Sequence, residues 1–169
     1  MKGRYLAAIL LAVTADSANA EPVTTVAEEC SRIAQKLASV EHAECLDRGL
    51  VTTRGESVQG APILFKEYAP VENLRPRARV LLVGGIHGDE YSSVSIVFKW
   101  MGILDAHHTG LFHWRIVPLL NPDGLLRQEA QRMNANGVDL NRNFPMPDWE
   151  NLAPRYWVDQ ANSSPRYFP

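Results

Sequence analysis

RVLLVGGIHGDEYSS, the stretch from Arg79 to Ser93, predicts a strand that turns into a helix. Its apolar run Val80–Val83 ends in two glycines, and His87 and Glu90 follow where an amphipathic segment begins. This order is typical of a buried strand that enters a helix through a tight turn, which glycine allows without a Cβ clash. An imidazole and a carboxylate at the spacing H-x-x-E can face one point there, as two ligands of a zinc ion do. The same spacing occurs by chance at exposed helix starts, so the other motifs decide between a metal site and a solvated turn.

The residues that follow predict a second strand beside the first. Tyr91–His107 has apolar residues at helical spacing, with its methionine and aromatic side chains expected in the core, and Trp114–Leu120 is another apolar run typical of a strand. Strand, helix and strand in close succession form a βαβ unit with parallel strands. Ligand sites in open parallel sheets lie at the carboxyl ends of the strands. We therefore expect His87 and Glu90 to lie beside the next loop, NPDG (Asn121–Gly124).

The residues before Arg79 predict a surface helix and two strands. Thr24–Leu46 shows helical periodicity, and Leu50–Tyr68 contains two β-rich runs separated by glycine and proline. Val71–Arg79 (VENLRPRAR) is polar and holds three arginines. We favour a solvated connection there over an anion-binding patch.

Composition and the first twenty residues predict one soluble domain behind a signal peptide. The chain has 169 residues, a net charge of −2 and 46% hydrophobic residues, with no basic surplus that would indicate nucleic-acid binding. Lys2 and Arg4 precede an apolar run, Tyr5–Val13, and Ala18–Ala20 is a small-x-small ending, so cleavage is expected after residue 20. The run is too short to span a bilayer and lacks the polar stripe of an amphipathic helix. We expect a periplasmic or secreted protein without a membrane span after cleavage.

Two cysteines leave the question of a disulfide open. Cys30 and Cys45 form an even pair, and an oxidising compartment would allow them to bond. An unbroken α-helix between them would hold them about 22 Å apart at 1.5 Å rise per residue. A bridge therefore needs a helix break, which we place near Ser39–His42, and neither cysteine is a candidate nucleophile.

The loop after the second strand of the βαβ unit carries a further set of polar side chains. Arg132 precedes MNANGVDLNRNFP (residues 133–145), which contains Asp139, Asn141 and Arg142. Arginine grips a carboxylate with two parallel hydrogen bonds, asparagine can hold the same group, and an aspartate can accept from the second nitrogen of a metal-bound histidine. Composition alone also fits a turn-rich surface loop with solvated charges.

Three motifs in order, HGDE, NPDG and NANGVDLNRNFP, resemble the zinc carboxypeptidase superfamily, and most closely its murein peptide amidase branch. The resemblance runs from about Gly55 to about Trp149. It implies an α/β fold with a mixed, largely parallel sheet and helices on both faces. After the signal peptide of residues 1–20, residues 21–50 are expected to form an N-terminal helical segment. Residues 51–169 are expected to form the N-terminal part of a zinc carboxypeptidase-like catalytic domain that is truncated at its C-terminus. The resemblance implies these roles: His87 and Glu90 as zinc ligands, Asp139 as the partner of His87, Arg132 as the group that stabilises the oxyanion, and Asn141 and Arg142 as the pair that binds the substrate carboxylate.

The resemblance implies a zinc metallocarboxypeptidase or amidase that hydrolyses a peptide bond next to a free carboxylate, in cell-wall (murein) peptides. Digestive carboxypeptidases carry an arginine before the glutamate ligand, whereas Gly88–Asp89 stands here, which favours amidase-like or deacylase-like branches. An N-acyl amino acid deacylase is therefore a second interpretation.

The third histidine ligand and the general-base glutamate of the family come after the NRNFP motif. His107, His108 and His113 come too early and flank the predicted helix and strand at the end away from the site. We therefore expect this chain alone to be inactive, as a truncated fragment or as a module that only binds carboxylate-bearing peptides.

Overall fold

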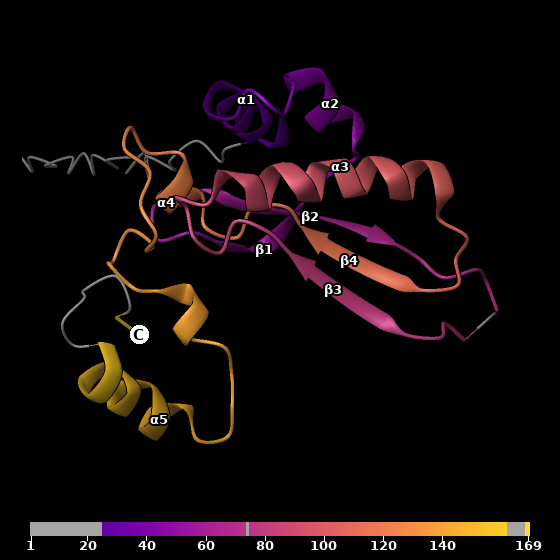
Figure 1. Ribbon diagram of the computed structural model, residues 1–169. Coiled ribbons are helices and arrows are strands. Elements are labelled where there is room, and N and C mark those ends of the chain that lie inside the picture. Colours follow the sequence, from indigo (N-terminus) through magenta and orange to yellow (C-terminus); the bar gives the residue numbers. More distant parts are fainter. Residues whose placement is uncertain (1–24, 74, 162–167) are drawn as a thin grey trace, which may run out of the picture.

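The computed structural model describes residues 25–73, 75–161 and 168–169. The predicted signal peptide lies outside the described residues. A four-stranded sheet with the order β1-β2-β4-β3 forms the centre of the fold (Figure 1). Its strands are β1 (Val51–Glu56), β2 (Pro62–Tyr68), β3 (Arg79–Val83) and β4 (His113–Val117). The predicted pair of strands within Leu50–Tyr68 is confirmed as an antiparallel hairpin, β1–β2.

The predicted βαβ unit is confirmed. β3 and β4 are parallel, with Arg79 opposite His113 and Val83 opposite Val117, and α3 (Tyr91–His107) connects them. The carboxyl ends of β3 and β4 therefore lie side by side, and the loops that follow the two strands leave the sheet at the same end. The chain that follows β4 contains α4 (Pro122–Leu125), η1 (Leu140–Arg142), α5 (Trp149–Tyr156) and the π-helical turn η2 (Trp157–Ala161).

The mixed α/β sheet is confirmed, but its details differ from the expectation. Among the described strands β3–β4 is the only parallel pair, because β2 forms a tight hairpin with β1 and is also antiparallel to β4. The helices α1 (Val26–Lys36), α2 (His42–Asp47) and α3 lie on one side of the sheet, not on both (Figure 1). They share that side because their apolar residues form a single core with the sheet, in which Ile33, Leu64, Phe98, Met101 and Ile116 are buried.

β3 was predicted as a buried strand, which is wrong for the described chain. It lies at one edge of the sheet, and Leu81 on the face away from the helices is 67% exposed. Helices cover only one face of the sheet, and α3 therefore has one buried face and one exposed face. Phe98 and Met101 are in the core as predicted, whereas Trp100 and Ile103 are about half exposed.

The single predicted helix over Thr24–Leu46 is two helices joined by a disulfide. Thr25 and Glu28 cap the start of α1 reciprocally, through Glu28 N to Thr25 Oγ1 (3.2 Å) and Thr25 N to Glu28 Oε2 (2.6 Å). The helix is interrupted between Lys36 and His42. A disulfide joins Cys30 and Cys45, whose Cα atoms are 5.6 Å apart. The predicted condition for a bridge, a break near Ser39–His42, is met.

A cluster of charges ties the end of α2 and β2 to α3. Asp105 of α3 accepts hydrogen bonds from Arg48 Nη1 (2.9 Å), from the Tyr68 hydroxyl (2.8 Å) and from Lys66. Burial acts to raise the pKa of the Asp105 carboxyl, but these hydrogen bonds outweigh burial and hold that pKa below its ordinary value. None of the helices in the described ranges is long and apolar enough to cross a bilayer.

Candidate metal and carboxylate site

The turn after β3 brings two of the predicted motifs into contact. Gly84 N donates to Val117 O (2.8 Å) and Asn121 N donates to Gly85 O (2.9 Å), so the pairing of β3 with β4 continues into both loops. Gly85 has a φ of +58°, which glycine adopts without strain. A Cβ on Gly88 would lie 2.1 Å from the carbonyl carbon of Gly124. Glycine at position 88 therefore allows HGDE and NPDG to touch, a role that the sequence pattern did not indicate.

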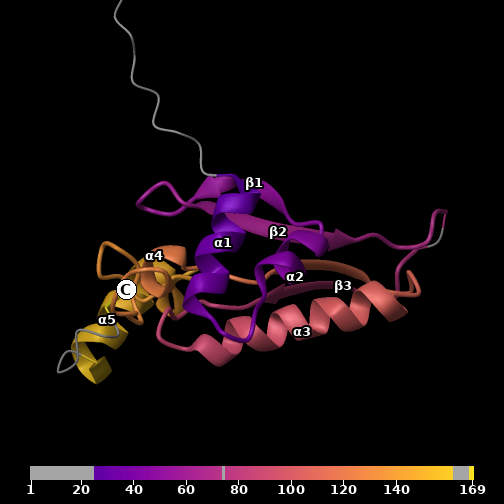
Figure 2. The same cartoon turned by 90° about the horizontal axis from the view of Figure 1, so that it is seen from above.

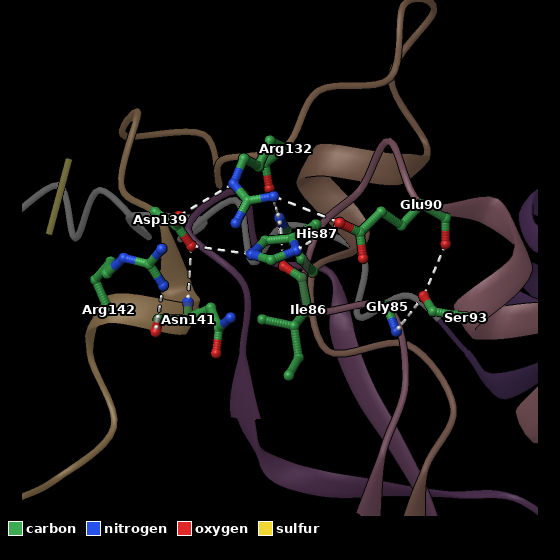
Figure 3. Close-up of polar contacts among 10 residues, drawn as sticks. Gly85, Ile86, His87, Glu90, Ser93, Arg132, Asp139, Asn141 and Arg142 are labelled. Atoms are coloured by element: carbon green, nitrogen blue, oxygen red, sulfur yellow. Dashed lines mark hydrogen bonds and ion pairs between the residues drawn. The ribbon is translucent and has the colours of Figure 1, made fainter. Parts of the chain in front are cut away.

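His87 and Glu90 face each other as the spacing predicted. His87 is only 6% exposed, and its Nδ1 lies 3.0 Å from Oε1 of Glu90, whose side chain is about half exposed (Figure 3). The histidine thus lies at the base of the turn while the carboxylate reaches toward solvent. Glu90 directly precedes α3, so both side chains are fixed by the junction of strand and helix.

Asp139 holds the other side of the His87 ring. Its Oδ1 lies 3.1 Å from His87 Nε2, and the residue has no exposed surface. A histidine whose Nε2 is held by a buried carboxylate keeps Nδ1 for a second partner. The two residues are 52 positions apart in the sequence, so only the fold brings them together.

Arg132 connects the two carboxylates. Its Nε donates to Asp139 Oδ2 (3.1 Å), its Nη1 lies 3.4 Å from Glu90 Oε1, and its side chain is 12% exposed. Figure 3 shows the guanidinium beside the His87 ring, between Asp139 and Glu90. A cation at this place neutralises part of the charge of both carboxylates and lies next to the atoms that could hold a metal.

Asn141 and Arg142 lie on the Asp139 side of the site, away from Glu90 (Figure 3). Asn141 N donates to Asp139 Oδ1 (2.9 Å), which fixes the turn η1 to the buried carboxylate. The Arg142 guanidinium lies 5.2 Å from the centre of the Tyr156 ring, and Trp149 Nε1 donates to Arg142 O (2.8 Å). α5 therefore supports Arg142 at the edge of a cavity of about 200 Å³.

Two asparagines that the sequence analysis did not assign hold these loops together. Asn121 is 2% exposed and donates through Nδ2 to Ile86 O (3.3 Å) and to Arg132 O (3.2 Å). Asn143 donates through Nδ2 to Asp139 O (2.9 Å). NPDG and NRNFP contain these residues, but a motif does not indicate which backbone group a distant amide contacts.

The geometry of His87 and Glu90 fits two ligands of one ion. A tetrahedral zinc with bonds of about 2.0–2.1 Å to nitrogen and oxygen separates these two donors by about 3.3 Å. The observed separation of 3.0 Å is close to that value. No three His, Cys, Asp or Glu side chains converge on one point within the described residues. His113 lies opposite Arg79 in the register of β3 and β4, at the end of these strands away from His87. This is the position predicted when His113 was excluded as a third zinc ligand.

Comparisons with known proteins relate the chain to desuccinylases, an amidase and a carboxypeptidase. A family model described as the succinylglutamate desuccinylase/aspartoacylase catalytic domain matches residues 76–164. Murein peptide amidase A of Escherichia coli K12 is 41% identical over 96 residues, which cover 57% of this chain and 36% of that protein. Carboxypeptidase E of Caenorhabditis elegans is 32% identical over 113 residues, covering 54% of this chain and 24% of that protein. The chain thus spans about a third, or less, of the length of these relatives.

Two solved structures share the fold. A candidate metallopeptidase from Shewanella amazonensis SB2B superposes with a TM-score of 0.52 at 19% identity, covering 83% of this chain and 51% of that one. Bovine thrombin-activatable fibrinolysis inhibitor, in complex with tick carboxypeptidase inhibitor, superposes with a TM-score of 0.50 at 20% identity, covering 74% of this chain and 44% of that one.

Proposed function

The chain belongs to the succinylglutamate desuccinylase/aspartoacylase catalytic-domain family, within the zinc carboxypeptidase superfamily, and we propose that it supplies zinc and carboxylate contacts for the hydrolysis of an amide bond. The observation that carries the proposal is the arrangement around His87. Its Nδ1 meets the Glu90 carboxylate and its Nε2 meets the buried Asp139, while Arg132 contacts both carboxylates. A solvated surface turn would not need a buried carboxylate behind the histidine.

His87 Nδ1 and Glu90 Oε1 would hold the zinc. When bound, zinc supplies a Lewis acid that polarises a carbonyl and makes water more acidic. Arg132 would donate to the carbonyl oxygen as negative charge develops on it, an effect for which loss of one donor typically costs about 3 kcal/mol. We assign no described carboxylate as proton acceptor, because Glu90 and Asp139 are both engaged with His87.

Asn141 and Arg142 would bind the free carboxylate of the substrate. A guanidinium can grip a carboxylate through two parallel hydrogen bonds, and the asparagine amide can donate a third. This pair selects substrates in which the scissile bond lies one residue away from a carboxylate. Arg142 is held at its cavity by Tyr156 and Trp149, so the distance between the carboxylate and the metal site would be set by α5 and η1.

Murein peptides are the substrates that we favour. Three observations support this choice: the identity to murein peptide amidase A, the glycine and aspartate that precede Glu90, and the Cys30–Cys45 disulfide, which is typical of an oxidising compartment such as the periplasm. The carboxylate of diaminopimelate in a murein peptide could occupy the place beside Arg142. The predicted signal peptide would deliver the protein to the same compartment.

An N-acyl amino acid deacylase is the second candidate function. The match of residues 76–164 to the desuccinylase and aspartoacylase model favours it. Both functions need a zinc ion and a bound carboxylate, and they differ in the substrate that surrounds the amide bond.

We expect the polypeptide of 169 residues to bind zinc weakly and to hydrolyse no peptide on its own. A structural zinc site binds its ion with a free energy of ~10–16 kcal/mol, and two ligands would provide about half of it. This corresponds to a dissociation constant of about 10⁻⁴ to 10⁻⁶ M. Isothermal titration with zinc measures it, and His87→Gln should abolish the binding while His107→Gln, at the far end of α3, should not. Hydrolysis of a peptide by the purified polypeptide, stopped by a chelator, would contradict the prediction.

We expect a peptide with a free carboxylate to bind at Arg142 and its amidated form to bind at least about tenfold more weakly, since a charge-assisted pair is lost. NMR titration of the Asn141 and Arg142 backbone amides with murein tripeptide, an ordinary peptide and an N-acyl aspartate separates the candidate functions. Arg142→Met should remove the binding, and Arg155→Met, an exposed arginine on the neighbouring helix α5, should retain it. Preference for the ordinary peptide would exclude the amidase, and preference for N-acyl aspartate would favour the deacylase. Equal binding of the amidated and free peptides would contradict the role of Asn141 and Arg142 in binding the carboxylate.

A further inference from the structure

The N-terminal hairpin, defined as α1, α2 and the disulfide between them, is part of the core. Cys30 and Cys45 have no exposed surface, and Ile33 and Leu37 are at most 3% exposed. Figure 2 shows α1 lying across β1 and β2, and its other face, with Glu28, Arg32 and Gln35, is exposed, as predicted for a surface helix. Arg48, directly after α2, donates to Asp105 of α3 at 2.9 Å. The hairpin is therefore fixed to the sheet, closed by a covalent bond and tied to α3.

One lysine of this hairpin reaches the loop that leads to the site. Lys36, in the last turn of α1, donates through Nζ to Arg127 O (2.7 Å) and to Gln128 O (3.0 Å). Its Nζ also lies 5.7 Å from the centre of the Tyr91 ring, and Tyr91 directly follows Glu90. An ammonium group that bonds two carbonyls makes charge-assisted hydrogen bonds, which are stronger than neutral ones.

The loop that Lys36 contacts is also held at its other end. Gln131 N donates to Gly124 O (2.9 Å), and Arg132 O accepts from Asn121 Nδ2 (3.2 Å) and from Gly88 N (3.4 Å). Between these points Arg127, Gln128 and Glu129 are exposed at the surface. Lys36 thus ties down the exposed part of the loop, four residues before the guanidinium that contacts Glu90 and Asp139.

We propose that Lys36 is a positioning residue, which holds the loop 127–131 from behind the site and so keeps the Arg132 guanidinium between Glu90 and Asp139. The proposal rests on the role proposed for Arg132 in the hydrolysis. The disulfide-closed hairpin supplies the rigidity that a lone surface lysine lacks, since an exposed lysine by itself contributes little.

NMR of the 169-residue protein tests the proposal without zinc or hydrolysis. The measured quantities are the rates at which Arg132 Nε–H and the Gln131 amide exchange with water, with the Arg132 signal assigned by its loss in Arg132→Lys. Lys36→Met removes the charge and the donors but keeps an apolar stem, so we expect both rates to rise about tenfold or more. Lys36→Arg should restore both, and Lys99→Met, an exposed lysine on α3, should leave both unchanged.

The amide of Ile116, a fully buried residue of β4, reports global stability. Its exchange should stay as in the unmodified protein in all three lysine variants. An equal acceleration of Ile116 in Lys36→Met would show a general loss of stability and would overturn the proposal. An unchanged Arg132 rate, or a failure of Lys36→Arg to restore it, would overturn it too. Because no substrate is used, these outcomes are distinct from a failure of the proposed hydrolysis.

Discussion

The Asp139→Ala substitution should lower the free energy of unfolding by about 3–5 kcal/mol, the range found when one partner of a buried charge pair is removed. Asp139 is fully buried, and its carboxylate faces three donors: Nε2 of His87, Nε of Arg132 and the amide of Asn141. Alanine leaves all of them without that partner in a place that water does not reach. Urea unfolding measures the effect as a shift of the midpoint at constant slope.

Two variants separate the charge of Asp139 from its shape. Asp139→Asn keeps one oxygen for His87 and Asn141 but removes the ion pair with Arg132, so we expect a smaller loss of about 1–3 kcal/mol. Asp148→Ala, at the exposed N-cap of α5 where the side chain makes no capping hydrogen bond, should stay within about 0.5 kcal/mol of the unmodified protein. A loss below about 1 kcal/mol for Asp139→Ala would contradict this account of the buried carboxylate.

Asp139 variants should also weaken zinc binding by about 10–100-fold, as expected for the carboxylate that orients a ligating histidine. The effect can be measured in the protein folded at low temperature, by the same titration that we describe for His87. Loss of stability without loss of zinc affinity would show that His87 is oriented by other contacts.

Removal of the Cys30–Cys45 disulfide should have the next largest effect, a loss of about 3 kcal/mol, because the bond closes a loop of 15 residues in the unfolded chain. Both sulfur atoms are in the core, so reduction also affects packing around Ile33 and Leu37. Comparison of unfolding with and without a reductant measures the loss.

The paired variant Cys30→Ala with Cys45→Ala provides the control. Its unfolding midpoint should match that of the reduced protein and should not respond to the reductant. An unchanged midpoint on reduction of the unmodified protein would show that packing alone holds the N-terminal hairpin in place. The same variant should also accelerate exchange at Arg132 Nε–H, because Lys36 would lose its rigid support.

Local patterns predicted much of the fold and the chemistry of the site. The hairpin β1–β2, the βαβ unit and the turn at His87 follow from periodicity and glycine spacing over about forty residues or fewer each. The resemblance of the motifs supplied the residues of the site, and the structure brings His87, Glu90, Asp139 and Arg132 within hydrogen-bonding reach of one another. Their roles in binding and catalysis stay predictions.

The features that sequence patterns missed depend on contacts between distant segments. The edge position of β3 and the one-sided cover of the sheet result from the order β1-β2-β4-β3. A short apolar run has the same sequence pattern in an edge strand as in a central strand, so the pattern does not predict the position. The packing of α1 on the sheet and the contact of Lys36 with carbonyls more than ninety residues away depend on the break between α1 and α2. Periodicity indicates which face of a helix is apolar, but not what covers it.

For this protein, the sequence by itself determined the chemical groups at the carboxyl ends of β3 and β4, because spacing around glycine and within short motifs is a local property. The tertiary structure alone decided which nitrogen of His87 meets Glu90 and which meets Asp139, and that Arg132 lies between both carboxylates. These arrangements result from side-chain packing across up to 52 positions of sequence, where burial and hydrogen bonding select one geometry among those that the motifs allow.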